Sequence, residues 1–159
     1  MIKFDETNKR IMRQLQKNNK ITNSTLAEIV NLSAPACLKR VNYLHEIGVI
    51  EKNVAILNSN LIGEGIVIIV EIEIEIEIER GKSFHKTNEG FIENIKNSPE
   101  VTQCYQIAGE IDFLLIVNVP NFLMFEAFSN RVLYGEPNIR RFKTLISMAR
   151  NKFKTEIEF

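Results

Sequence analysis

The chain has 159 residues, of which 45% are hydrophobic and 25% charged, and its formal net charge at pH 7 is zero. This composition is typical of a soluble globular protein with room for one domain or two small ones. No stretch approaches the roughly 20 uninterrupted apolar residues of a membrane span, and the start of the chain lacks the apolar segment of a signal peptide. We therefore expect a cytoplasmic protein with no membrane partner.

The charge is unevenly distributed along the chain. The turn-forming residues Asn58, Ser59 and Asn60 indicate a linker, which divides the chain into domains over residues 1–60 and 61–159. The first has 9 Lys and Arg against 5 Asp and Glu, and the second has 11 against 15. A basic first part beside an acidic remainder is expected if only the first contacts phosphate, although two unrelated surface compositions would give the same pattern.

Two helices are predicted at the start of the first domain. The first begins after Asp5, a residue type that caps helix N-termini, and ends at Asn18. The second runs from about Ser24 to Val30, with its apolar residues at helical spacing.

A third predicted helix begins at the N-cap Ser33, has Pro35 in its first turn, where a missing N–H has no cost, and ends at Gly48. Its apolar residues recur at intervals of three and should face the core. They are Leu38, Val41, Leu44 and Ile47.

Three helices in this order make a trihelical helix-turn-helix, whose third helix reads DNA. Lys39 and Arg40 suit a phosphate or a guanine edge, and small residues near the start of the helix allow close approach to the major groove. The alternative is that Lys39 and Arg40 only solvate the helix and Ser33 only caps it. The expected DNA-binding set is Ser33, Ala34, Pro35, Ala36, Lys39, Arg40 and Tyr43.

The second domain alternates between strand and helix signals. Period-2 alternation from Ile66 to Glu79 predicts a strand. The later predicted elements are a helix over Phe84–Asn97, strands over Val101–Ala108 and Phe113–Val119, a helix over Asn121–Leu133 that buries Phe122, Phe125, Phe128 and Val132, and a strand from Ile139 to about Arg150. The order βαββαβ predicts a ferredoxin-like domain, so the chain as a whole is of the α+β class.

The first strand of this domain carries a row of glutamates on one face. The strand is longer than usual, so we expect a bend or an end that projects past the sheet. Since like charges on one face need compensation, we expect Glu75, Glu77 and Glu79 to lie across from Arg141 and Lys143 of the last strand. A cation site is disfavoured, because same-face residues lie about 7 Å apart along a strand and no His or Asp helps.

No catalytic, metal or cofactor site is indicated by the sequence. Cys37 and Cys104 lie too far apart for a Cys-x-x-Cys motif and are expected to be packing residues. Neither His45 nor His85 has a partner visible in the sequence, and no Ser-His-Asp, Cys-His or phosphate-cradling glycine motif occurs.

Several segments resemble the Lrp/AsnC family of transcriptional regulators. Leu32–Val41 has the family pattern of Leu-Ser, small residues with proline, an apolar residue and a basic pair, and Leu44–Ile50 continues it with Leu-x-x-x-Gly-Val-Ile. Pro99–Tyr105 and Gly109–Phe113 are similar to the family's Pro-Glu-Val and Gly-x-x-Asp-Tyr elements, whereas Asn8 stands where the family usually has Asp. The resemblance implies a winged helix-turn-helix followed by a ferredoxin-like domain, in a sequence-specific regulator that is not an enzyme.

The resemblance also implies partners. Members of the family dimerise by packing sheet against sheet, assemble dimers further, and bind effectors, often amino acids, near the Gly-x-x-Asp loop and the last strand. Carried onto this sequence, the effector-binding candidates are Gly109, Glu110, Asp112 and Thr144. The alternative is that Gly109 only makes the turn and Asp112 only caps it. The glutamate-rich first strand departs from the family, whose first strand is more apolar on its dimer-facing side, so the assembly could be shifted.

Two other functions fit the same two-domain plan. Siroheme decarboxylases share it, but the region after Ile50 lacks the arginine-rich element that those enzymes carry. A protein that binds an effector and has lost DNA binding also fits, because the third helix has few basic residues. We favour a regulator that binds double-stranded DNA as a homodimer or a higher assembly of dimers and responds to a small effector such as an amino acid.

Overall fold

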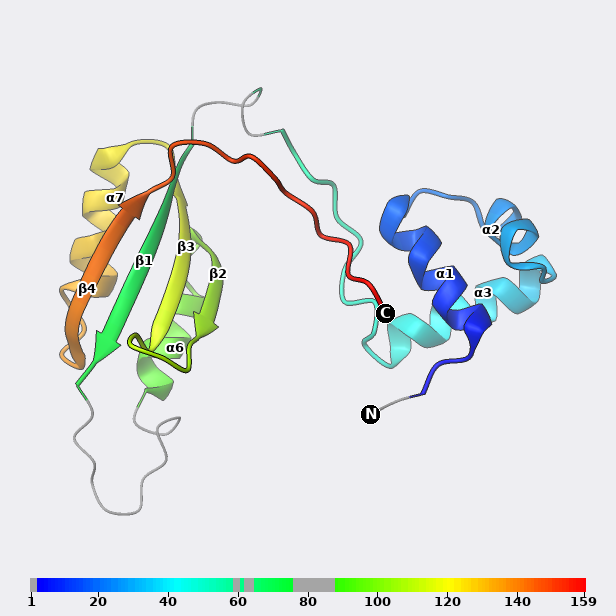
Figure 1. Cartoon of the computed structure of the whole chain (residues 1–159), viewed down its shortest axis with the longest axis horizontal. Coiled ribbons are helices and arrows are strands. Elements are labelled where there is room, and N and C mark those ends of the chain that lie inside the picture. Colours follow the sequence, from blue (N-terminus) through cyan, green and yellow to red (C-terminus); the bar gives the residue numbers. More distant parts are fainter. Residues whose placement is uncertain (1–2, 59–60, 62–64, 76–87) are drawn as a thin grey trace, which may run out of the picture. The chain divides into compact units, whose positions relative to one another are not determined.

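The computed structural model describes residues 3–58, 61, 65–75 and 88–159. It separates the chain into two compact units, one made of Met1–Ile56 together with Asn151–Phe159, and the other of Leu57–Arg150. The last nine residues therefore pack with the N-terminal helices, which a single cut near residue 60 does not anticipate. Figure 1 shows the elements of each unit.

The N-terminal unit contains three helices, α1 (Glu6–Lys17), α2 (Asn23–Val30) and α3 (Ala34–Glu46), as predicted. The side chain of Asp5 caps α1 by accepting a 2.7 Å hydrogen bond from the backbone N–H of Asn8. Asn31 ends α2 in the left-handed region, with φ of 59°, a conformation that asparagine tolerates better than most residues. These caps and the turn set the spacing of a helix-turn-helix.

The core of this unit corrects one part of the predicted pattern. Leu38, expected to face inward, is 42% exposed, whereas Cys37 is completely buried. Successive residues of an α-helix are about 100° apart, so Cys37, Val41 and Leu44 form one narrow stripe and Leu38 lies to its side. The buried cluster consists of Ile11, Met12, Leu26, Ala27, Val30, Cys37 and Leu44.

Residues 151–159 pack against α1. The side-chain amide of Gln16 forms two hydrogen bonds with the backbone of Ile157, accepting from its N–H at 2.8 Å and donating to its carbonyl oxygen at 3.1 Å. Arg13 donates to the carbonyl oxygen of Phe159 at 2.6 Å, and its guanidinium lies 5.5 Å from the centre of the Phe159 ring. The end of the chain is thus a structural part of the helix-turn-helix unit.

The second unit has the predicted ferredoxin-like topology. Its sheet has the order β2-β3-β1-β4, every neighbouring pair is antiparallel, and the helices cover one face of the sheet (Figure 1). The elements are β1 (Ile66–Ile74), α6 (Glu89–Lys96), β2 (Val101–Gln106), β3 (Phe113–Val119), α7 (Phe122–Phe128), a π-helical turn η1 (Ser129–Leu133) and β4 (Ile139–Ile146). Both β2 and β4 are shorter than the sequence predicts.

Alternation along β1 and β3 builds the core between the sheet and the helices. Ile68, Val70 and Ile72 of β1 are completely buried, because every second side chain of a strand points to the same face. They pack with Phe91 of α6 and Phe128 of α7, in one cluster. The apolar half of the predicted first strand is therefore the centre of this unit.

The helical segment after Asn121 departs from the expected pattern at its start. Phe128 and Val132 are buried as predicted, but Phe122 is 57% exposed, since it lies about 120° around an α-helix from Phe128. The wide turn η1 follows this helix, and a 2.9 Å hydrogen bond from the N–H of Tyr134 to the carbonyl oxygen of Ser129 closes it.

Cys104, expected to be a packing residue, is exposed because it lies on the edge strand β2.

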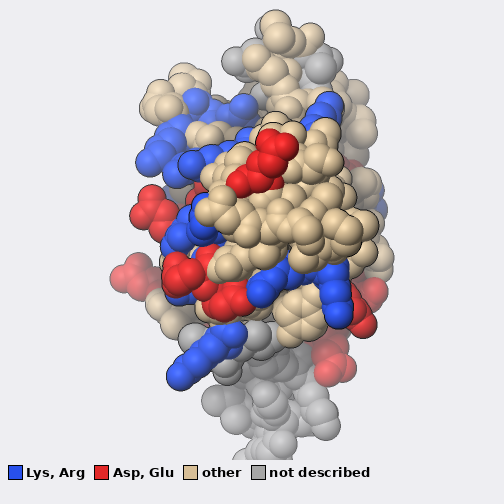
Figure 2. All heavy atoms as spheres, turned by 90° about the vertical axis from the view of Figure 1, so that its right-hand side faces the viewer, with Lys and Arg blue, Asp and Glu red and all other residues tan. Residues whose placement is uncertain are grey.

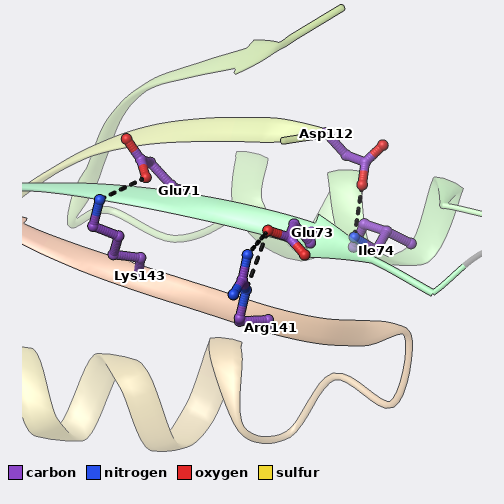
Figure 3. Close-up of polar contacts among 6 residues, drawn as sticks. All are labelled: Glu71, Glu73, Ile74, Asp112, Arg141 and Lys143. Atoms are coloured by element: carbon purple, nitrogen blue, oxygen red, sulfur yellow. Dashed lines mark hydrogen bonds and ion pairs between the residues drawn. The ribbon is translucent and has the colours of Figure 1, made fainter. Parts of the chain in front are cut away.

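The glutamate row faces basic residues of β4, but in a different register from the predicted one. Glu71 lies opposite Lys143 at 3.6 Å, and Glu73 lies opposite Arg141 at 2.5 Å (Figure 3). The shared sheet face is as predicted, whereas the partners expected were Glu75 and two later glutamates. The reason is that β1 ends at Ile74, after a register shift. Glu77 and Glu79 lie outside the described residues.

The contact of residues 151–159 with α1 predicts a measurable effect of Gln16→Ala. Because Gln16 makes two hydrogen bonds with Ile157 and each contributes about 1 kcal/mol net, we expect the free energy of unfolding of this unit to fall by about 2 kcal/mol and proteases to cleave after residue 150 more readily. Gln14→Ala, with the same change of helix propensity in the same helix, is the control. Equal behaviour of the two variants in denaturant titration and limited proteolysis would contradict the contact.

Candidate functional site

The outer side of α3 is exposed and contains most of the residues predicted to bind DNA. Ser33, Pro35, Lys39 and Tyr43 are all exposed. Ser33 occupies the N-cap position of α3, and its hydroxyl makes no capping bond among the described residues, so the oxygen remains accessible to a ligand. Ala36 is half-buried.

One exposed residue on this side, Leu38, was missed by the sequence reasoning. Leu38 and Asn42 are exposed beside Lys39. Leu38 was assigned to the core because its spacing from Val41 is helical, and only the buried position of Cys37 shows which stripe of the helix faces inward. Ala34 was expected on the DNA-binding side, but it packs against the buried cluster and is only partly exposed to solvent.

Lys39 and Arg40 have different surroundings, although they are adjacent in the sequence. Within the described residues, no acidic group lies within ion-pair distance of Lys39, which is exposed. The guanidinium of Arg40 instead donates from Nη1 to Asp5 at 2.7 Å and to the side-chain oxygen of Asn8 at 2.8 Å. The pKa of Asp5 is lowered from its usual value, first by the backbone N–H of Asn8 and then by Arg40.

The helix-turn-helix unit has several basic side chains on one face. Figure 2 shows Lys and Arg around an area of uncharged surface, with acidic side chains interspersed.

The loop before β3 contains the effector candidates, and Asp112 has a structural function there. Its Oδ2 accepts a 2.8 Å hydrogen bond from the N–H of Ile74 (Figure 3), and its own N–H donates to the carbonyl oxygen of Ile72 at 2.8 Å. The carbonyl oxygen of Asp112 accepts a third bond, from Ile107 at 2.8 Å. Asp112 thus continues the hydrogen bonding of β1 at the residue before β3 begins.

Gly109 and Glu110 are exposed in the same loop. A Cβ added at Gly109 would meet only a side-chain atom of Ile107, at an ordinary 3.7 Å. Among the described residues, Gly48 is the one glycine with positive φ. The conformation of the loop therefore does not require glycine at position 109.

Thr144 does not meet Asp112 within one chain. It lies opposite Val70 on the side of the sheet that the helices cover, and β1 separates it from β3. Thr144 is level with Val70, whereas Asp112 bonds to Ile74, the neighbour of Glu73, and Glu73 is three residues from Val70. Thr144 and Asp112 are therefore also offset by roughly 10 Å along the strands. The four effector candidates do not form one site in a single subunit.

The described part of the chain contains no group of three or more His, Cys, Asp or Glu residues that could hold a metal ion. His45 lies 3.4 Å from the side-chain nitrogen of Asn53, and His85 lies outside the described residues. No helix of the described part is both long and apolar enough to cross a membrane.

Both units match models of known protein families. Residues 4–51 match a winged helix-turn-helix DNA-binding model, and residues 72–157 match the Lrp/AsnC ligand binding domain. A helix-turn-helix joined to such a domain defines a DNA-binding transcriptional regulator. The chain belongs to the Lrp/AsnC family.

Full-length relatives agree with this assignment. An HTH-type transcriptional regulator of Sinorhizobium fredii is 33% identical over 95% of this chain and 86% of its own length. The leucine-responsive regulatory protein of Rhizobium meliloti is 29% identical over 99% and 97%. The crystal structure of an AsnC family regulator from Agrobacterium tumefaciens is 28% identical, with a TM-score of 0.84 over 98% of this chain and 97% of that one.

A further similar structure is a Neisseria meningitidis transcriptional regulator in complex with L-Met. It is 25% identical to this chain, with a TM-score of 0.83 over 98% of this chain and 97% of that one. Together these matches show a helix-turn-helix followed by a ligand-binding domain, which is the order of the predicted two-domain plan.

The bonds of Asp112 predict that Asp112→Ala destabilises the sheet unit without any ligand. The variant leaves the N–H of Ile74 without its acceptor, which costs about 1–3 kcal/mol if the group stays buried, whereas Asp112→Asn retains an oxygen acceptor and should lose less. Glu110→Ala, an exposed change in the same loop, should stay within about 0.5 kcal/mol of the original protein. Urea denaturation checks the order, and equal stability of the Asp112→Ala and Glu110→Ala variants would exclude the structural role.

Proposed function

We propose that this regulator binds duplex DNA through the outer side of α3, as a homodimer, in the cytoplasm. The observation that supports the DNA contact most directly is the exposed Lys39, which lies beside Pro35 and Tyr43 and has no acidic partner among the described residues. A basic side chain in this position of a third helix suits a phosphate or the O6 and N7 atoms of guanine. Ser33 and the first turn of α3 suit a phosphate oxygen.

The open face of the sheet supports the dimer. On the side that the helices leave uncovered, Val67 and Ile69 of β1 lie beside Leu114 and Ile116 of β3, and all four are only half-buried. A second subunit that packs its sheet on this face would remove these side chains from water, at about 25 cal/mol per Å² of apolar surface. Two copies then present two α3 helices to successive major grooves, about 34 Å apart, and such dimers can assemble further.

We also propose that an amino acid binds at a boundary between subunits and modulates DNA binding. The complex of the Neisseria meningitidis regulator with L-Met supports this class of ligand. Gly109 and Glu110 are exposed, and an acidic side chain with free backbone N–H groups suits an α-amino acid. Because Asp112 and Thr144 do not meet in one chain, a site that uses both needs a second subunit. No catalytic activity is part of this proposal, since the relatives reported above are regulators.

Lys39→Ala tests the DNA contact. Loss of one phosphate contact should weaken binding at low salt and reduce the slope of log K against log salt concentration by about 0.9. Binding is measured by fluorescence anisotropy on a duplex that the unmodified protein selects from a random pool. Lys96→Ala removes the same charge from α6 of the other unit and is the control. An unchanged slope for Lys39→Ala, or a lack of binding by the unmodified protein, contradicts the proposal.

The effector proposal predicts that particular amino acids raise the melting temperature. A ligand that binds the folded state at 100 times its Kd stabilises it by about 2.7 kcal/mol, and Glu110→Ala should reduce this shift without changing the melting temperature of the free protein. A panel of L-amino acids including L-Met, with the D-enantiomers as matched controls, is measured by thermal denaturation. The absence of any enantiomer-specific shift would contradict the proposal.

A further inference from the structure

Arg40 is held by groups of its own chain on the side of α3 that faces α1. One nitrogen, Nη1, donates to Oδ2 of Asp5 at 2.7 Å and to the side-chain oxygen of Asn8 at 2.8 Å. The other carboxylate oxygen of Asp5 accepts the N–H of Asn8 at 2.7 Å. Arg40 is 35 positions from Asp5 and 32 positions from Asn8 along the chain. The three residues thus form one connected polar group between the start of α1 and the middle of α3.

We propose that Arg40 is a positioning residue, which fixes the orientation of α3 on α1 for DNA reading and does not itself contact DNA. This inference rests on the proposed DNA-binding function and assigns the two members of the basic pair different tasks. Lys39 contacts the nucleic acid, whereas Arg40 sets the angle at which α3 is presented.

The place of Arg40 on the helix supports this division. It follows Cys37 by three residues, so it lies at the edge of the buried stripe, whereas Lys39 lies on the outer side. The side chain of Arg40 is 35% exposed, and the ion pair spans two helices rather than one. Its neighbour Asn8 is only 9% exposed, and the amide oxygen of this buried side chain obtains its hydrogen bond from Arg40.

Transfer of Arg40 to DNA would have a cost that Lys39 does not incur. If Nη1 left for a phosphate, the buried oxygen of Asn8 would lose its donor and the carboxylate of Asp5 would lose its cation. The carboxylate would also remain close to the incoming phosphate, with like charge. Lys39, without an acidic partner among the described residues, contacts a phosphate without breaking any such bond.

Because residue 8 is an asparagine, Arg40 has a single anionic partner in this polar group. With asparagine at position 8, the guanidinium has one carboxylate, that of Asp5, and one neutral acceptor. The nearest other acidic residue in the sequence, Glu6, is paired with Lys9 at 2.6 Å. One cation therefore matches one anion, and removal of the Asp5 charge should loosen the link while leaving the rest of α1 intact.

Asp5→Asn separates the two possible roles of Arg40. Asparagine is an N-cap as good as aspartate, so α1 keeps its cap, while Arg40 loses both the negative charge and the second carboxylate oxygen to which it donates. A positioning Arg40 predicts weaker DNA binding, by about 3- to 10-fold, with an unchanged salt slope. A DNA-contacting Arg40 predicts equal or tighter binding, because the variant frees the guanidinium and removes a negative charge.

Two further variants complete the experiment. Asp5→Asn combined with Asn8→Asp moves the carboxylate to the other acceptor of Arg40 and should restore the affinity to within about 2-fold. Glu6→Gln removes the same charge one residue away and should bind at least as tightly as the unmodified protein. Affinities and salt slopes are measured as for Lys39→Ala, and melting temperatures verify that each variant is folded.

The outcomes distinguish this inference from the function on which it rests. If the unmodified protein binds and Lys39→Ala reduces the salt slope, but Asp5→Asn binds equally well or the double variant fails to recover, the positioning role is wrong and DNA binding stands. An Arg40→Ala variant whose slope falls by about 0.9 also overturns it. Should Arg40→Ala not fold, Asp5→Asn, which keeps the acceptor that caps α1, decides the matter. If the unmodified protein does not bind duplex DNA, both proposals fail.

Discussion

The packing of α3 against α1 and α2 is the constraint on which DNA reading depends. Cys37 and Leu44 are completely buried, and once these two positions face the core, the geometry of the helix places every other side chain of α3. Lys39 then faces outward and Arg40 faces α1, where Asp5 and Asn8 bind it. Because successive residues of an α-helix are about 100° apart around its axis, these two adjacent basic residues have different surroundings.

The sheet unit combines an apolar core with a charged strip on its open face. The isoleucines and valines of β1 that face the helices are buried, while Glu71 and Glu73 pair with Lys143 and Arg141 on the opposite side. Exposed pairs of this kind are worth roughly 0–1 kcal/mol each, so they contribute little to stability. These ion pairs instead affect the register of β1 with β4 and the charge of the partner surface that can pack on this face, because like charges opposite one another are unfavourable.

Contacts between distant parts of the chain give two segments functions that their composition does not indicate. Asp112 resembles a ligand-binding acid in the sequence, yet its carboxylate accepts a hydrogen bond from the N–H of Ile74 just before β3 begins. The last residues, although polar and apolar in alternation like a strand, pack on α1 through Gln16 and Arg13. In each case a backbone group needs a hydrogen-bond partner, and a remote side chain supplies it.

The sequence by itself determined the three helices, their caps, the ferredoxin-like order of strands and the family, because caps, periodicity and short motifs are local. It also determined that glutamates of β1 and basic residues of β4 share a face, since strand alternation has a period of two. Only the tertiary structure decided the register of those pairs, the exposure of Leu38 and Phe122, and the partners of Arg40 and Asp112. These depend on where a strand ends and which helical stripe meets a neighbour, and such choices are made by packing between segments far apart in the chain.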